Sequence, residues 1–172
     1  WINFNEEIAQ IYATAVKHGN ASAIVTFNPG VSLIRHTQAE DYTAGELNDP
    51  FDVLASSRWV DGSQWHALTF LGSNWSARDT RHPAEKWARW VSTAVSRGGV
   101  VTLDMGPNWD PQAGPIGSLA PAQVEQVQAV QAAVKATLVL PDSVDRENPS
   151  RPAVELHARG GLANFFTKAK AG

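Results

Sequence analysis

Helix-like and strand-like segments alternate along most of this chain, and the alternation limits the folds it can adopt. Residues 5–17 place apolar side chains on one helical stripe, and a short, mostly apolar run follows at residues 21–27. The pattern repeats with an apolar run at 64–71, a helical stripe at 82–97 and another apolar run at 100–105. Helices that alternate with short buried strands are typical of parallel βα units, in which helices cover the sheet.

The first and last helical segments should each bury one stripe of side chains. In residues 5–17, acids in the first turn and Gly19 beyond the end fit the start and stop of a helix. Its expected buried stripe is Ile8, Ile11, Tyr12, Ala15 and Val16. Residues 121–138 are predicted to form the last helix. Its expected buried stripe is Val124, Val127, Gln131 and Val134.

The number of strands points to part of a barrel. A ring of eight βα units needs about 250 residues, whereas this chain has 172 residues and, besides its clear strands, only an irregular one at 41–43. We therefore predict an α/β fold: a partial (β/α)8 TIM barrel of about four βα units with parallel strands, the carboxyl-terminal half, over residues 1–140. Residues 141–172, rich in Pro and Gly, are predicted to be an extension or linker. The missing amino-terminal half would be a partner, and the open half barrel is expected to self-associate.

The composition excludes several classes of partner and site. The formal net charge of −3 gives no basic surface for nucleic acid. No apolar stretch approaches the roughly 20 residues of a membrane helix, so no membrane partner is expected. The chain has no cysteine, and its histidines show no metal-ligand spacing, so we expect neither a metal nor a cofactor. Its seven tryptophans are of interest because an indole ring can pack against the C–H face of a sugar.

Candidate site residues follow from position, because the working groups of barrel enzymes lie at the carboxyl ends of the strands. Asn28 follows the run at 21–27, and Glu46 follows the irregular strand. The other candidates for contacts with a substrate are Asp41, Tyr42, Trp65, His66 and Trp75. Two carboxylates that face a sugar can divide the roles of acid and base, because burial and mutual repulsion separate their pKa values. The acidic segment at 40–46 therefore suggests a hydrolase.

Each candidate also has a structural alternative. Glu40, Asp41 and Glu46 could belong to a solvated turn or a cap, which is the commoner role of acids in loops. His66 could be a core residue, a partner for a sugar hydroxyl or a general base, and Asp104 could brace a neighbouring loop. We expect Glu40 to support its loop and Glu46 to carry chemistry.

Several segments together resemble the second half of the catalytic barrel of glycoside hydrolase family 29, the α-L-fucosidases. Residues 98–108 (GGVVTLDMGPN) resemble the final strand of that family, and residues 110–116 resemble its acidic-glycine turn. Residues 41–46 (DYTAGE) resemble its Asp-Tyr-x-Thr-Pro-Glu segment, and residues 65–76 resemble its Trp-Glu … Trp-Gly-Tyr segment. The resemblance covers about residues 1–138.

The resemblance implies a retaining mechanism, with an aspartate nucleophile at the end of the fourth strand and a carboxylic acid/base from a later loop. By position, Glu46 resembles the acid/base, and the nucleophile would lie upstream of Trp1. The intact protein would then be an enzyme and this chain alone inactive, with a secreted or periplasmic location favoured. Asn28-Pro29-Gly30 stands where many members have an arginine, and Trp65-His66 replaces Trp-Glu, so a related glycoside could replace the fucoside.

The function predicted from these observations is that of a fragment of a retaining exo-glycosidase that hydrolyses α-L-fucosides or related glycosides. Its partner would be a carbohydrate. The alternative is a non-catalytic carbohydrate-binding or scaffold remnant that lacks the nucleophile.

Overall fold

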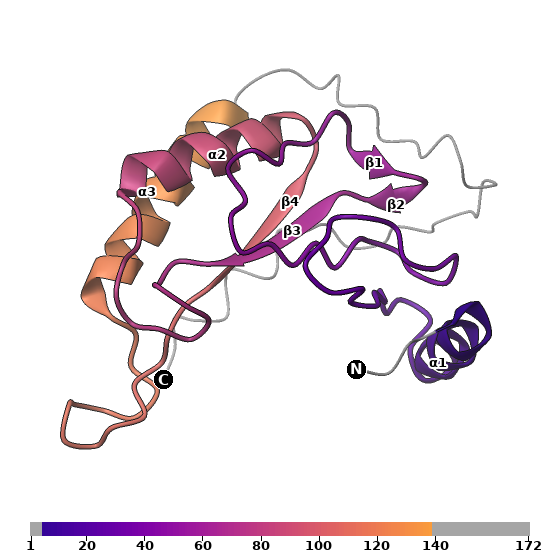
Figure 1. Cartoon of the computed structure of the whole chain (residues 1–172), viewed down its shortest axis with the longest axis horizontal. Helices are drawn as coiled ribbons and strands as arrows, with labels where there is room; N and C mark the ends of the chain where they lie inside the picture. The colour runs from indigo at the N-terminus through magenta and orange to yellow at the C-terminus, as the bar shows by residue number, and fades with distance from the viewer. Residues whose placement is uncertain (1–4, 139–172) are drawn as a thin grey trace.

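The computed structural model describes residues 5–138, so the tail at 141–172 and the predicted boundary at 140 lie outside the described residues. The elements in chain order (Figure 1) are α1 (Glu6–Gly19), β1 (Trp59–Val60), β2 (Ser63–Gln64), β3 (His66–Phe70), α2 (Ala84–Ser96), β4 (Val100–Asp104) and α3 (Pro121–Leu138). None of the helices among residues 5–138 is both long enough and apolar enough to cross a bilayer.

The centre of the structure is a βαβ unit, as the alternation of segments predicts. Strands β3 and β4 are parallel, with His66 opposite Val100 and Phe70 opposite Asp104. Helix α2 connects the two strands and packs against α3, and both helices lie on the same side of the strands (Figure 1). The predicted strand at 64–71 is divided, because Gln64 belongs to β2, which pairs antiparallel with β1.

Residues 42–46 extend this sheet by two isolated parallel bridges, Tyr42 to Gln64 and Glu46 to Leu68. Between the bridges, the Thr43 side chain makes the hydrogen bonds to the backbone of His66 that a main-chain partner would make in a regular strand. Its Oγ1 donates to the His66 carbonyl at 2.8 Å and accepts from the His66 amide at 3.0 Å. Gly45 has a φ of +59°, and a Cβ at this position would lie 1.9 Å from the His66 carbonyl oxygen. The close approach of two backbones therefore explains both the irregular strand and its glycine.

The predicted strand at residues 21–27 does not form, although all of these residues are described. The amide of Asp41 donates to the Val25 carbonyl at 2.7 Å, as in a ladder. The Val25 amide, however, donates to the Asp41 carboxylate at 2.9 Å instead of to a backbone carbonyl. A side chain thus takes the place of the next ladder bond, and residues 5–138 show a short parallel sheet and no barrel.

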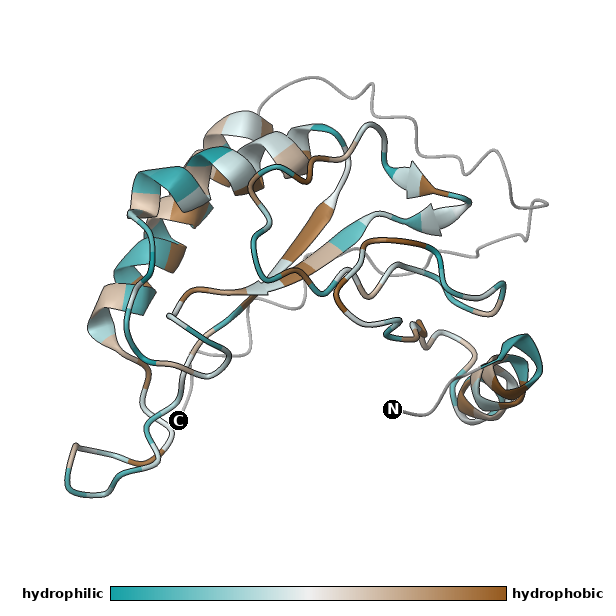
Figure 2. Cartoon of the chain, viewed as in Figure 1, coloured by the Kyte–Doolittle hydropathy of each residue, from teal (hydrophilic) through white to brown (hydrophobic). Residues whose placement is uncertain are grey.

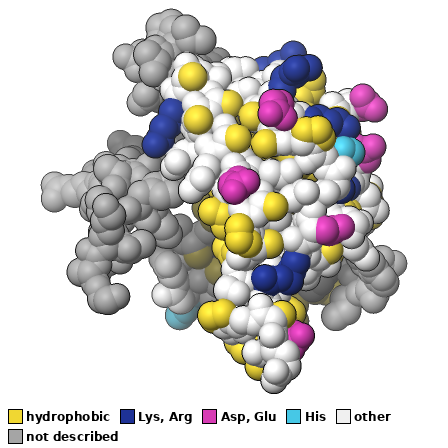
Figure 3. All heavy atoms as spheres, turned by 90° about the vertical axis from the view of Figure 1, so that its left-hand side faces the viewer, with side chains coloured by type: hydrophobic (Ala, Val, Ile, Leu, Met, Phe, Trp, Pro, Cys, Tyr) yellow, Lys and Arg dark blue, Asp and Glu magenta, His cyan; other side chains and the backbone are white. Residues whose placement is uncertain are grey.

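The side of the sheet that faces α2 and α3 forms the main hydrophobic core. Trp87 and Trp90 of α2 meet side chains that alternate along the strands. The other buried members of this core are Leu47, Ala55, Trp65, Ala67, Leu71, Val91, Ala94 and Val130. Figure 2 shows hydrophobic segments along β3 and β4 and hydrophilic segments on the helices. On the side of the molecule seen in Figure 3, acidic and basic side chains are interspersed.

The buried faces of α1 and α3 differ from the predicted stripes. Helix α1 buries Ala9 and Ala13, whereas Ile11 is 62% exposed. Small side chains allow α1 to pack closely against Phe27 and Ala39. Helix α3 buries Gln123, Gln126 and Val130, while Gln131 is exposed. Of the stripe predicted for α3, Val127 and Val134 do pack against the core.

Candidate active site

One face of the sheet points away from α2 and α3, and we call it the inner face. Because successive side chains of a strand point to opposite faces, the neighbours of core residues lie on it. The inner face consists of Tyr42, Ala44, Glu46, His66, Leu68, Phe70, Val100, Thr102 and Asp104. Val100 is 47% exposed and Thr102 is also exposed, so this face is open. Strand direction places Phe70 and Asp104 at its carboxyl end, and Glu46 is the last residue of the irregular strand, opposite Leu68 in the middle of β3.

Glu46 and Asn28, both predicted as site residues, lie together at the end of the irregular strand. The side-chain amide of Asn28 donates from Nδ2 to Glu46 Oε2 at 2.5 Å. The Asn28 side chain is itself oriented, because its Oδ1 accepts a hydrogen bond from the Gly30 amide at 2.9 Å. Asn28 is exposed and Glu46 is partly exposed, so solvent reaches the pair. The Asn-Pro-Gly turn therefore directs an amide donor at the carboxylate and leaves the carboxylate accessible.

His66 lies on the inner face closer to its amino end. Its Nδ1 lies 2.9 Å from the Thr43 carbonyl oxygen and 3.2 Å from that of Ala44. Both oxygens can only accept, so Nδ1 carries the proton and Nε2 accepts from the Thr102 hydroxyl at 2.8 Å. Burial lowers the pKa of His66, although the two carbonyls oppose this. His66 is therefore a neutral imidazole of fixed tautomer that links three parallel segments.

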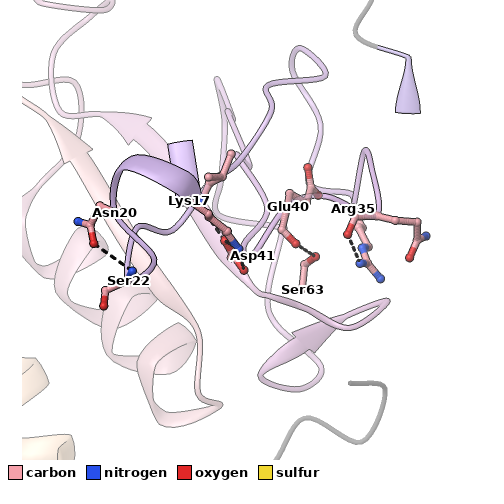
Figure 4. Close-up of polar contacts among 9 residues, drawn as sticks. Lys17, Asn20, Ser22, Arg35, Glu40, Asp41 and Ser63 are labelled. Carbon is pink, nitrogen blue, oxygen red and sulfur yellow. Dashed lines mark hydrogen bonds and ion pairs between the residues drawn. The ribbon is translucent and has the colours of Figure 1, made fainter. Parts of the chain in front are cut away.

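Tyr42 packs edge to face against His66, with ring centroids 5.3 Å apart. Asp41, the residue before Tyr42 in the sequence, has a different role: its carboxylate accepts from Lys17 Nζ at 2.8 Å and from the Val25 amide. Figure 4 shows the Lys17–Asp41 contact. Asp41 therefore fastens α1 to the amino end of the sheet, and the structure does not bring it to Glu46.

Glu40 is fully buried, and its Oε1 accepts from the His36 amide at 2.8 Å. Its backbone carbonyl accepts from the Ser63 hydroxyl, as Figure 4 shows. Burial raises the pKa of Glu40, and backbone amides led by that of His36 partly oppose the rise. These contacts agree with the expectation that Glu40 supports its loop.

Trp65 and Trp75 have different environments. Trp65 is 3% exposed and lies in the main core, where a Cβ at Gly99 would come within 2.6 Å of its ring. We therefore leave Trp65 out of the candidate site. Trp75 is partly exposed and follows β3, with its ring 4.8 Å from that of Phe70. Trp75 thus has the position expected of an aromatic contact at the carboxyl end.

Asp104, the other inner-face carboxylate of the described strands, accepts from the Ser76 amide at 2.6 Å. Glu46 is opposite Leu68, which in turn is opposite Thr102, two residues before Asp104. With strands about 4.8 Å apart, the backbones at 46 and 104 are therefore at least about 10 Å apart. The hydrogen bond from the Ser76 amide shows that the Asp104 carboxylate braces the loop that carries Trp75.

Two polar residues of the site region were not identified from the sequence. The Arg81 guanidinium lies 3.8 Å from the Phe70 ring centroid and donates to the Thr69 hydroxyl at 3.0 Å. Gln123 of α3 is fully buried and binds the loops that follow β3 and β4. The sequence around Arg81 and Gln123 contains no pattern that predicts their contacts with these strand ends and loops. Among residues 5–138, no group of three or more acidic or imidazole side chains could hold a metal ion.

Comparison with known proteins gives a fold likeness only. No protein-family model and no curated protein matches the chain. The solved structure of MfFcnA4, an endo-fucoidan hydrolase of glycoside hydrolase family 107, is similar over 76% of this chain, with a TM-score of 0.62 and 18% identity. MfFcnA9, an endo-fucoidan hydrolase of the same family, is similar over 75% of the chain, with a TM-score of 0.61 and 20% identity.

The chain has a glycoside hydrolase-like fold. The fold neighbours belong to family 107, whereas the sequence resemblance is to family 29. The match covers 24% of MfFcnA4 and 28% of MfFcnA9, so this chain spans about a quarter of their length.

Proposed function

We propose that the chain forms part of the catalytic barrel of a retaining glycosidase that acts on fucose-containing glycans. In this proposal the chain contributes about four βα units, and Glu46 is the acid/base. Glu46 would protonate the leaving glycosidic oxygen and then, as a carboxylate, take a proton from the attacking water. The nucleophilic aspartate would come from sequence upstream of residue 1.

The observation that carries this proposal is the Asn28–Glu46 pair at the carboxyl end of parallel strands, in a fold similar to that of fucoidan hydrolases. The general acid of a glycosidase must be reachable from the substrate and held in one orientation. The partial exposure of Glu46 and its hydrogen bond to Asn28 supply these two properties. Tyr42, His66 and Trp75 remain proposed substrate contacts on the inner face or at its end.

The two fold neighbours are endo-acting enzymes. Their endo action favours cleavage within a polymer over the exo action expected from the resemblance to α-L-fucosidases. We therefore propose an endo-acting fucan hydrolase, with exo action on α-L-fucosides as the competing assignment.

A carbohydrate-binding role without catalysis is the second candidate. It is favoured by the role of Asp104, the other inner-face carboxylate of the described strands, which accepts a hydrogen bond from the Ser76 amide and braces a loop. Binding without hydrolysis by the intact protein would support this role.

The two candidates are separated by incubating the intact protein with fucoidan and following product size by gel electrophoresis. The endo-acting enzyme would release a ladder of oligosaccharides from the wild type and almost none from Glu46→Gln, whereas an exo-acting enzyme would release monosaccharide. Polymer that stays intact with the wild type would contradict catalysis. As a control, Glu85→Gln alters an exposed acid in the first turn of α2, on the opposite side of the sheet.

A further inference from the structure

The connection between β4 and α3 forms a projecting hairpin-like loop, residues 107–119, which we call the finger. Pro107 and Leu119 form an antiparallel bridge. The Asn108 amide donates to the Ser118 carbonyl at 2.9 Å, and the Gly117 amide donates to the Asn108 carbonyl at 2.7 Å. Figure 1 shows the finger extending beyond the carboxyl end of β4. It therefore lies at the same end of the sheet as Glu46.

One buried side chain holds the tip of the finger in shape. Asn108 is 2% exposed, and its Nδ2 lies 2.9–3.1 Å from the carbonyl oxygens of Asp110, Gly114 and Pro115. Its Oδ1 accepts from the Asp110 amide at 3.2 Å. Because a single amide satisfies several backbone groups of the turn, the tip has one preferred conformation.

The base of the finger is fastened to the loop that carries Trp75. Arg78 donates from Nη1 to the Ser118 carbonyl at 2.7 Å. Gln123 accepts from the Gly106 amide at 3.1 Å and donates to the carbonyls of Ala77 and Asp79 at 2.8 and 2.7 Å. The loops after β3 and β4 are thus one connected structure, and the finger is fixed relative to the strand ends.

This rigid finger presents Trp109, which is 72% exposed. A large indole held in water by a braced loop contributes little to folding, so a binding role is its better explanation. Residues 107–119 contain one acid, Asp110, and no lysine, arginine or histidine. The finger therefore offers an aromatic face beside exposed uncharged side chains, among them Gln112 and Ile116, a set that suits the C–H face and hydroxyls of a sugar ring.

We propose that Trp109 is a platform for a sugar unit of a polysaccharide, at a distance from the unit that Glu46 contacts. This inference rests on the proposed function, because it assigns the finger to the same glycan chain. A rigid platform loses little conformational entropy when it binds, which favours its use for holding an extended polymer. Trp109 would thus contribute to affinity for long substrates and leave the bond-breaking step unchanged.

Binding is tested with the full 172-residue chain by electrophoresis through gels that contain increasing fucoidan. We expect fucoidan to retard the wild type, and Trp109→Ala to raise the dissociation constant roughly 3- to 10-fold, as for the loss of one aromatic contact. Tyr12→Ala is the control, because Tyr12 is a 55% exposed aromatic side chain on α1, which Figure 1 shows far from the finger, and it should leave binding unchanged. Because Trp109 is exposed, Trp109→Ala should melt at the wild-type temperature, which shows that the variant is folded.

Two results would overturn the platform: no retardation of the wild type, or equal retardation of Trp109→Ala and the wild type. The same substitutions in the intact protein, tested in a hydrolysis assay, separate this inference from the proposed function. Retardation that depends on Trp109 in a protein that cleaves no glycan would retain the platform and reject the glycosidase. Cleavage of fucoidan with the same KM for Trp109→Ala and the wild type would retain the glycosidase and reject the platform.

Discussion

Asn28 donates a hydrogen bond to Glu46 at 2.5 Å, although 18 residues separate the two in sequence. The two residues come from the turn after residues 21–27 and from the end of the irregular strand, so the fold alone brings them together. The Oδ1 atom of Asn28 accepts a hydrogen bond from the Gly30 amide. This arrangement makes Asn28 a positioning residue for Glu46.

Asn28→Ala should therefore lower the kcat of the intact protein by about tenfold. This corresponds to an increase of roughly 1.4 kcal/mol in the activation free energy when Glu46 is no longer held in one orientation. The KM should change less, because Asn28 acts through Glu46. Stability should change by less than about 0.5 kcal/mol, since Asn28 is exposed. Asn20→Ala is a matched control, because Asn20 caps the Ser22 amide in a similar exposed turn. Equal kcat values for Asn28→Ala and the wild type would show that the contact does not orient Glu46.

Gly45→Ala should lower the free energy of unfolding by about 2 kcal/mol or more. Position 45 has a φ of +59°, and a Cβ there would lie 1.9 Å from the His66 carbonyl oxygen, which is backbone and cannot move aside cheaply. Urea denaturation measures this loss. The control is Gly19→Ala at the end of α1, where a Cβ meets nothing within 4 Å. A Gly45→Ala variant as stable as Gly19→Ala would contradict the close approach of residues 42–46 to β3.

Gln123→Ala should destabilise the chain by about 2–4 kcal/mol, because it removes three hydrogen bonds and leaves buried backbone groups unpaired. Gln131→Ala on the same helix should change stability by less than about 0.5 kcal/mol, because Gln131 is exposed. Thermal melts of both variants give the comparison. If Gln131→Ala were the more damaging change, the buried face of α3 would be the one first expected from the sequence.

The pH dependence of stability should carry a contribution from His66. Burial lowers its pKa in the folded chain below the usual value of about 6.5. As the pH falls below about 6.5, the unfolded chain takes up the proton first, so the free energy of unfolding decreases until the folded chain is protonated as well. His66→Gln should therefore reduce the loss of melting temperature between pH 7 and pH 5. His82, whose pKa burial also lowers, should leave part of the slope in place.

Glu40 should contribute to the pH dependence of stability with the opposite sign from His66, and at lower pH. Burial raises its pKa in the folded chain above the unfolded value of about 4.3. Between these two values the folded chain holds a proton that the unfolded chain has lost, so stability decreases as the pH rises through this window. Glu40→Gln should remove that decrease, which melting temperatures between pH 4 and pH 7 would show. A profile for Glu40→Gln parallel to that of the wild type would contradict the effect of burial on this carboxyl group.

Much of the architecture could be predicted from local signals in the sequence. The helices at 82–97 and 121–138 and the strand at 100–105 are confirmed, because apolar spacing and flanking Gly or Pro determine such elements locally. The strand at 21–27 could not be excluded in this way, because the Asp41 carboxylate that replaces its ladder bond comes from a distant segment. The local pattern of apolar residues cannot predict a hydrogen bond to a residue that is distant in sequence.

The site could be predicted only in part, for a similar reason. Asn28 and Glu46 were placed by the rule that functional groups follow parallel strands, and the structure brings them together. Trp65 was expected at the site because tryptophan suits sugars, but its ring fills the space beside Gly99 in the core. Burial of a large aromatic depends on which face of a strand it occupies, and one residue of shift reverses that face.

The central claim, that Glu46 is the acid/base of a retaining glycosidase, is tested most directly by chemical rescue. The intact Glu46→Ala variant would be assayed with an aryl glycoside of a fucose oligosaccharide, whose leaving group needs little protonation, with and without azide. We predict that hydrolysis falls by about 100-fold or more, as for the loss of one general acid/base, and that azide restores turnover and yields a glycosyl azide of retained configuration. Turnover equal to that of the wild type without azide would contradict the claim.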